Sequence, residues 1–157
     1  MNHQYTINLL EDEKILWEGK PVPALQSYLY WSFVLLWVFV LLFTLVGIVL
    51  IPFVFILGIP YAQAVYEKRY YWVTNKRIVY RRGFLGYKIS SLPLNRVSDV
   101  IISRTFFENM FGFGSLQIQT LAGQISTGAG GSEGDLRAVD EPEKLQQLIL
   151  EQLKHNK

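Results

Sequence analysis

The stretch that decides the fold is YLYWSFVLLWVFVLLFTLVGIVLIPFVFILGIPYAQAVY, residues 28–66. It is the densest part of a run from 21 to 66 that contains no Asp, Glu, Lys, Arg or His. About 18 apolar residues already indicate a membrane span. At about 1.5 Å per residue, residues 28–66 would form a helix of about 58 Å, nearly twice the hydrocarbon thickness of a bilayer. The stretch therefore predicts two spans.

The backbone breakers near its middle, Gly47 and Pro52, predict a turn there and helices over 28–46 and 50–66. Aromatic residues near both ends of the run, and Trp17 before it, are candidate membrane-interface anchors: Trp17, Tyr28, Tyr30, Trp31, Tyr61 and Tyr66. Anchors at both ends indicate that the two ends return to one side. The expected apex at 45–51 has no polar residue, so one tilted span with a re-entrant piece is the alternative.

The net charge of +2 hides three blocks of different sign. Residues 1–66 hold two basic and four acidic residues (−2), residues 67–104 hold nine and two (+7), and residues 105–157 hold four and seven (−3). The positive block begins directly after the apolar run, where the positive-inside rule applies. We therefore expect a two-span protein of the plasma membrane, with its C-terminal domain and both termini in the cytoplasm.

The rest of the composition is that of a soluble domain. We expect a cytoplasmic segment over 1–27, the transmembrane hairpin over 28–66 and one domain over 67–157. The chain has no cysteine, which excludes disulfides and thiolate sites. Acidic residues precede the apolar run, which is too long and too late for a cleavable signal peptide.

After the hairpin the sequence pattern changes from helical to strand-like. Strands are predicted at 70–74, 78–80, 87–92, 97–105, 115–120, 124–127 and 136–139. A short helical turn is expected at 106–111, and a final helix is expected after Asp140, with Glu143 completing a capping box. The apolar residues 15–17 are either a strand added to this domain or an interface anchor. The expected fold is α+β: about seven strands in a sandwich or barrel, capped by a C-terminal helix.

Several blocks resemble the membrane-anchored bacterial pleckstrin-homology (PH) family. Residues 71–83, YWVTNKRIVYRRG, are similar to the Y-x-V-T-N-x-R-I-x-x-x-x-G opening of that family. Residues 92–100, LPLNRVSDV, and 111–116, FGFGSL, resemble two later blocks, and 13–21 resembles its lead-in. The resemblance covers about residues 10–153. It implies a PH-like fold of two sheets with seven strands and a C-terminal helix, and a docking or assembly role.

The sharpest functional candidate is a group of basic residues close to the apolar run: Lys68, Arg69, Lys76, Arg77, Arg81 and Arg82. A basic patch beside an anionic leaflet gains about 1 kcal/mol per charge. We expect contact with anionic lipid headgroups or a protein partner; the alternative is that these charges only set topology and solvate strands. For Phe106, Phe107 and Phe113, core packing is expected and a partner surface is the alternative.

Other site chemistries are weak in this sequence. The glycine-rich segment 128–134 lacks the pattern of a phosphate-binding loop, and Arg96 and Asp99 are expected to hold a turn together. The only histidines, His3 and His155, lie near the two ends of the sequence, and no paired carboxylates occur. We therefore expect no catalysis, no cofactor, no metal and no nucleic-acid partner. A membrane-tethered binding or assembly module is predicted; a small transport or channel subunit is the alternative, although the spans hold no ionisable group.

Overall fold

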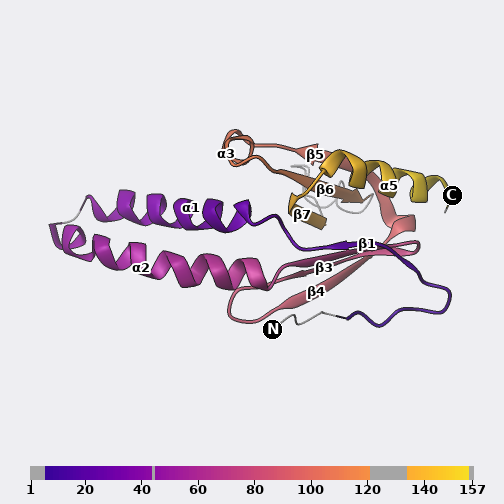
Figure 1. Cartoon of the computed structure of the whole chain (residues 1–157), viewed down its shortest axis with the longest axis horizontal. Helices are drawn as coiled ribbons and strands as arrows, with labels where there is room; N and C mark the ends of the chain where they lie inside the picture. Colours follow the sequence, from indigo (N-terminus) through magenta and orange to yellow (C-terminus); the bar gives the residue numbers. More distant parts are fainter. Residues whose placement is uncertain (1–5, 44, 121–133, 156–157) are drawn as a thin grey trace.

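The computed structural model describes residues 6–43, 45–120 and 134–155. A long helical hairpin projects from one end of a domain that consists of two sheets and a C-terminal helix (Figure 1). The C-terminal helix ends at the opposite end of the molecule from the hairpin tip (Figure 1). The chain is therefore divided into an apolar arm and a mixed α+β domain.

The arm consists of α1 (Ala24–Leu41) and α2 (Leu45–Glu67), which lie side by side (Figure 1). The predicted turn at Gly47 is wrong, because Gly47 and Pro52 both lie inside α2 and the helices are separated only by residues 42–44. Apolar helices of the membrane type tolerate Gly and Pro in their interior, where the freed backbone groups are satisfied locally. Thr44, in this connection, lies outside the described residues.

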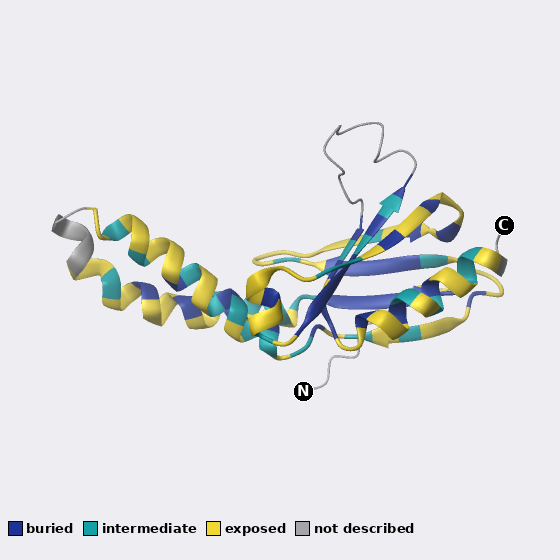
Figure 2. Ribbon diagram, turned by 90° about the horizontal axis from the view of Figure 1, so that it is seen from above, coloured by how far each residue is buried: buried dark blue, intermediate teal, exposed yellow. Residues whose placement is uncertain are grey.

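Both helices are long and apolar enough to cross a membrane, by length and composition. At about 1.5 Å per residue, α1 is about 27 Å long and α2 about 35 Å, close to the hydrocarbon thickness of about 30 Å. Only 17% and 22% of the residues in their apolar windows are buried, and most of the arm is exposed (Figure 2). A core helix of a soluble protein would instead be mostly buried.

The domain contains seven described strands in two antiparallel sheets. The first sheet has the order β1 (Ile15–Gly19), β2 (Tyr70–Thr74), β3 (Arg77–Arg82), β4 (Lys88–Pro93). The second has the order β5 (Val97–Ser103), β6 (Gly114–Thr120), β7 (Gly134–Val139). A 3₁₀ turn (Leu94–Arg96) joins the sheets, α3 (Phe106–Met110) joins β5 to β6, and α5 (Pro142–His155) follows β7.

Strand β1 settles the alternative left open for residues 15–17. It pairs antiparallel with β2, with Gly19 opposite Tyr71, and the Trp17 side chain packs against the domain core. The predicted domain boundary at residue 67 leaves this strand out, because β1 precedes the arm in sequence but belongs to the sheet that follows it. The arm is thus inserted between two hydrogen-bonded strands. The predicted strand at 124–127 lies outside the described residues.

The core lies between the two sheets and under α5. Its fully buried side chains come from both sheets and the helix: Val73, Ile78, Leu116, Ile118, Leu136 and Ile149. The predicted start of the last helix is shifted, since α5 begins at Pro142, the residue whose fixed φ suits a first helical position. The N-cap position therefore falls on Glu141 and not on Asp140, and the Glu143 carboxylate pairs with Arg104 at 2.8 Å.

A second cluster joins the arm to the domain. Leu25, Leu29 and Val65 from the arm pack with Phe113, directly before β6, and with Ala138 in β7. The Val22 amide also donates a hydrogen bond to the Ala138 carbonyl at 2.7 Å. The base of the arm is therefore packed against the domain, in addition to being connected to it by the chain.

Candidate functional site

The end of the domain that carries the arm is here called the hairpin end. Four of the six predicted basic residues and most of the predicted aromatic anchors lie there. Strand β2 begins three residues after α2 ends, and its antiparallel partner β3 returns Arg81 opposite Tyr70. The β3–β4 turn (83–87) therefore lies beside the base of α2, with the rings of Phe84 and Tyr61 5.3 Å apart. The β2–β3 turn at residues 75–76 lies at the other end of the strands, here called the far end.

This topology separates the six predicted basic residues into two groups. Lys76 and Arg77 lie at the far end, where they bind the N-terminal segment. Arg77 pairs with Glu13 at 2.8 Å and also donates to the Asn8 carbonyl at 2.6 Å, while the Lys76 ammonium donates to the Glu11 carbonyl. These two cations are engaged in holding the segment that leads into β1.

Glu13 is the centre of that far-end contact. Its carboxylate is buried and accepts hydrogen bonds from Arg77, from the Thr74 hydroxyl at 2.8 Å and from the Leu10 amide at 2.7 Å. Burial alone would raise the pKa of Glu13, but these hydrogen bonds and the Arg77 charge outweigh it and hold the pKa below its usual value of 4.5. Asn75 completes the contact by accepting from the Lys14 amide at 2.8 Å.

Lys68, Arg69, Arg81 and Arg82 lie at the hairpin end. Arg81 is 9% exposed, and its guanidinium lies 4.1 Å from the centroid of the Tyr87 ring. Arg69 is half-buried and its charge opposes the burial that raises the pKa of Tyr71 to about 12. The side chains of Arg81 and Arg69 are therefore largely packed within the domain and present little charge at its surface.

The accessible charges at the hairpin end surround the β3–β4 turn. Arg82 is exposed and stacks 5.5 Å from the Tyr80 ring, and Lys68 donates to the Leu85 carbonyl at 2.6 Å. Lys88, which sequence reasoning missed, is exposed and lies opposite Arg82 in the β3–β4 register. Lys88 follows the predicted turn after Arg82, and this position opposite Arg82 in a hairpin could have added it to the group of predicted basic residues.

The tip of the same turn is apolar. Leu85 is 85% exposed and Phe84 is 43% exposed, although both are large hydrophobic residues. The turn thus combines an exposed apolar tip with Lys68, Arg82 and Lys88 at its flanks. This combination suits a boundary between apolar and anionic surroundings, where the apolar tip is buried and the cations meet negative charge.

The predicted aromatic anchors of the arm gather around its base. Tyr28 meets Phe111 and Phe113 edge to face at 5.8 and 5.7 Å, and Tyr61 stacks on Phe33 at 4.7 Å. Tyr66 is partly buried in the same junction and Tyr30 packs against Trp31 at 5.4 Å. Trp31 is 47% exposed. The structure places five of the six predicted anchors in one zone, and their role at a membrane interface stays a prediction; the sixth, Trp17, packs in the domain.

Comparison with known families decides what kind of domain this is. The family model described as "Bacterial PH domain" matches residues 25–153. The chain belongs to this family. No curated protein and no solved structure matches it significantly.

The contacts in the structure give the first sequence block a physical role. In this bacterial PH domain the T-N-x-R part of the first block, Thr74, Asn75 and Arg77, binds the N-terminal segment around Glu13. Strand β1 lies before the matched range, yet it completes the first sheet. The two sheets and the C-terminal helix agree with the PH-like α+β fold that the resemblance implies.

The remaining sequence candidates add no site to the bacterial PH domain. Asp99 accepts a hydrogen bond from the Val100 amide at 2.7 Å, which is a local backbone contact. The glycine-rich segment lies outside the described residues up to Gly134, which is in β7. Among the described residues, no group of three or more His, Cys, Asp or Glu side chains could hold a metal ion.

Proposed function

We propose that this protein is a membrane-tethered bacterial PH module that acts by binding or assembly at the cytoplasmic face of the plasma membrane. The observation that carries the proposal is the insertion of the apolar arm between β1 and β2, two neighbouring strands of one sheet. A two-span arm with this connection holds the domain directly on the membrane surface. The family supports a binding role, and the partner is a protein or anionic lipid headgroups.

Three residues are the proposed headgroup contacts: Lys68, Arg82 and Lys88. They flank the apolar tip of the β3–β4 turn beside the base of the arm, and each cation near an anionic leaflet contributes about 1 kcal/mol. Of the six basic residues predicted from the sequence, Arg69, Lys76, Arg77 and Arg81 are not among the proposed headgroup contacts. Arg77 lies four residues from Arg81, about 13 Å along the strand, which exceeds the Debye length of about 8 Å at physiological salt.

Protein docking is supported by the edge of the first sheet, where β4 has no further strand beside it among the described residues. β4 is an edge strand in the order β1-β2-β3-β4, and Ile89 on it is 50% exposed. An exposed edge offers backbone hydrogen bonds to an added strand from a partner or from a second copy. Crosslinking in native membranes, followed by mass spectrometry, would identify such a partner through crosslinks to β4.

The tether and its orientation are tested by reporter fusions at both termini. We expect both fusions to report the cytoplasm and the protein to resist extraction by alkaline carbonate. Opposite locations of the two reporters would contradict the hairpin. Robust ion leakage from liposomes that contain the purified protein would favour a transport subunit over a binding module.

The headgroup contact is tested in the full chain, in nanodiscs with and without anionic lipid. A polarity-sensitive fluorophore at Leu85→Cys reports the environment of the turn, since the chain has no other cysteine. We expect a larger blue shift with anionic lipid, lost in a K68E/R82E/K88E variant and retained in the far-end control K76E. The same emission wavelength with and without anionic lipid would contradict the proposed headgroup contact.

A further inference from the structure

The short helix α3 has an inverted distribution of polar and apolar residues. Its ionisable residue, Glu108, is 8% exposed, while Phe106, Phe107 and Met110 are 78%, 54% and 65% exposed. The Glu108 carboxylate accepts from the Ser115 hydroxyl at 2.9 Å and from the Thr105 amide at 2.9 Å, which completes a capping box. Large apolar residues rarely face water while a carboxylate is buried beside them. The outer face of α3 is therefore suited to an apolar medium.

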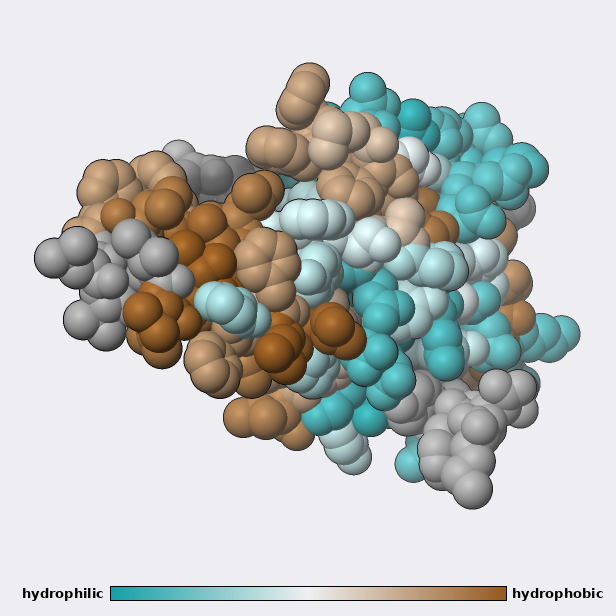
Figure 3. All heavy atoms as spheres, turned by 60° about the vertical axis from the view of Figure 1, so that its left-hand side comes forward, coloured by the Kyte–Doolittle hydropathy of each residue, from teal (hydrophilic) through white to brown (hydrophobic). Residues whose placement is uncertain are grey.

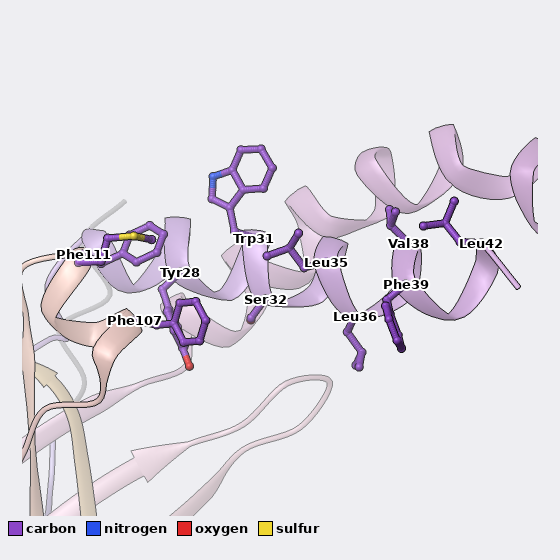
Figure 4. A pocket seen from close by; sticks show the side chains of 11 residues that line it. Tyr28, Trp31, Ser32, Leu35, Leu36, Val38, Phe39, Leu42, Phe107 and Phe111 are labelled. Atoms are coloured by element: carbon purple, nitrogen blue, oxygen red, sulfur yellow. The ribbon is translucent and has the colours of Figure 1, made fainter.

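That outer face continues into a groove along α1. The groove has a volume of about 850 Å³ and is walled on one side by Phe107, Met110 and Phe111. The other wall consists of α1 side chains from Tyr28 to Phe39, and of Leu42 directly after the helix (Figure 4). The hydroxyl of Ser32 in this wall donates to its own helix, to the Leu29 carbonyl at 3.0 Å. The surface offers a polar ligand little to bind.

Packing fixes α3 at the beginning of the arm. Tyr28 in the second turn of α1 contacts Phe111, which directly follows α3, and Phe113 next to it. Hydrophobic residues gather on the arm side of the molecule and hydrophilic residues over the domain (Figure 3). The exposed side chains of α3 are thus attached at the level where the arm leaves the domain.

We infer that α3 inserts into the cytoplasmic leaflet and that phospholipid acyl chains fill the groove between α3 and α1. The inference rests on the proposed tether, because α1 would then be covered by lipid over the same residues that form one wall of the groove. Leu35 and Phe39 line the groove, so an acyl chain that contacts them on α1 can continue directly into it. A soluble apolar ligand or a protein segment would have to displace that lipid. With the β3–β4 turn beside α2, the domain would contact the membrane on both sides of the arm.

The experiment uses the full chain in nanodiscs made with brominated phospholipid. The absence of native cysteine allows single labels of an environment-sensitive fluorophore at three exposed apolar positions: Phe106→Cys in α3, Phe39→Cys in α1 and Leu150→Cys in α5. Phe39, about three turns beyond Tyr28 on α1, reports the tether at a distance from α3, and Leu150 is the matched control on the domain. Met110→Cys repeats the α3 measurement in case the label at 106 disturbs folding, which the unfolding temperature monitors.

We expect blue-shifted emission and quenching by brominated acyl chains at 106, 110 and 39, and neither at 150. Water-like emission at 106 and 110 with quenching at 39 would overturn the inference and leave the tether intact. Blue-shifted but unquenched emission at 106 and 110 would also overturn it, because protein rather than lipid would cover α3. Water-like emission at 39 would reject both the tether and the inference.

Discussion

At the scale of single residues, the buried pair of Glu13 and Arg77 makes the clearest stability prediction. Glu13→Gln removes the charge while keeping the shape, and leaves the guanidinium, whose side chain is 20% exposed, without its anion. Because hydrogen bonds to charged groups contribute about 1.5–3 kcal/mol, we expect a loss of about 2 kcal/mol in unfolding free energy. Tryptophan fluorescence during unfolding in detergent measures it, since Trp17 and Trp72 lie in the first sheet.

The same pair predicts a pH dependence. The folded state holds the pKa of Glu13 below 4.5, so the carboxylate stabilises the fold above that pH and the stabilisation is lost as pH falls through the lowered pKa. The wild-type protein should therefore lose more stability below pH 4.5 than Glu13→Gln. Lys144→Ala breaks an exposed pair with Glu141 and serves as the control, with no measurable change expected. Parallel acid profiles for wild type and Glu13→Gln would contradict the assignment.

Tyr71 makes a second prediction, because its hydroxyl links the two sheets. The hydroxyl in β2 donates to the Arg137 carbonyl and accepts from the Arg137 amide, both at 3.1 Å, in β7. Tyr71→Phe removes both bonds and should cost about 1–2 kcal/mol, because the Arg137 amide and carbonyl lose their partner. Tyr87→Phe, at a ring that is 63% exposed, is the matched control. An unchanged melting temperature in Tyr71→Phe would show that water replaces the hydroxyl there.

At the scale of elements, α1 and α2 depend on close packing at one glycine. A Cβ atom built on Gly58 in α2 lies 3.0 Å from the Tyr30 ring and 3.2 Å from Val34. Gly58→Leu should force the helices apart and lower the unfolding temperature, as overpacking costs about 1–3 kcal/mol. Gly86→Leu adds the same side chain in the β3–β4 turn, where nothing lies within 4 Å, and should leave stability unchanged. Equal effects of both substitutions would argue against a tight interface at Gly58.

The elements that sequence reasoning found are those with local signals. Periodicity predicted the strands around Asn75 and the apolar stripe of α5, and Gly112 marked the end of α3, where its φ is +73°. The start of α3 also had a signal in the spacing of Thr105 and Glu108. Features that depend on distant parts of the chain could not be predicted this way.

Four such features were missed or misplaced. No local pattern says that residues 15–19 pair with residues beyond the arm, so β1 was left open. The turn of the arm was assigned to Gly47 because a breaker is a local signal, whereas α2 already begins at Leu45 and continues through Gly47 and Pro52. Core packing was expected for three phenylalanines and is found for Phe113 alone; Phe106 and Phe107 are exposed because the capping contacts of Glu108 turn α3 outward. The six basic residues are close in sequence and were therefore grouped together. The antiparallel strands β2 and β3 place Lys76 and Arg77 at one end of the sheet and the other four residues at the opposite end.

At the scale of the whole molecule, the insertion of the arm between β1 and β2 has a direct consequence. Gly19 pairs with Tyr71, so the next two residues toward the arm are Lys20, after Gly19, and Tyr70, before Tyr71. Neighbouring strands lie about 4.8 Å apart. A two-residue Asn-Gly turn can therefore replace residues 21–69 and close β1 onto β2 as an ordinary hairpin. Phe113, which the base of the arm covers, would be changed to Ser in the same variant.

We expect this variant to be a monomeric, cooperatively unfolding domain in the absence of detergent. The fragment 67–157 with the same Phe113→Ser change should fail to fold, although it contains the whole domain predicted from sequence. It lacks β1, so the edge of β2 at Trp72 loses its partner strand and Arg77 loses Glu13. Circular dichroism and thermal unfolding compare the two. Equal cooperative unfolding of both would show that β1 is dispensable, and that the arm is attached beside the domain and not built into its sheet.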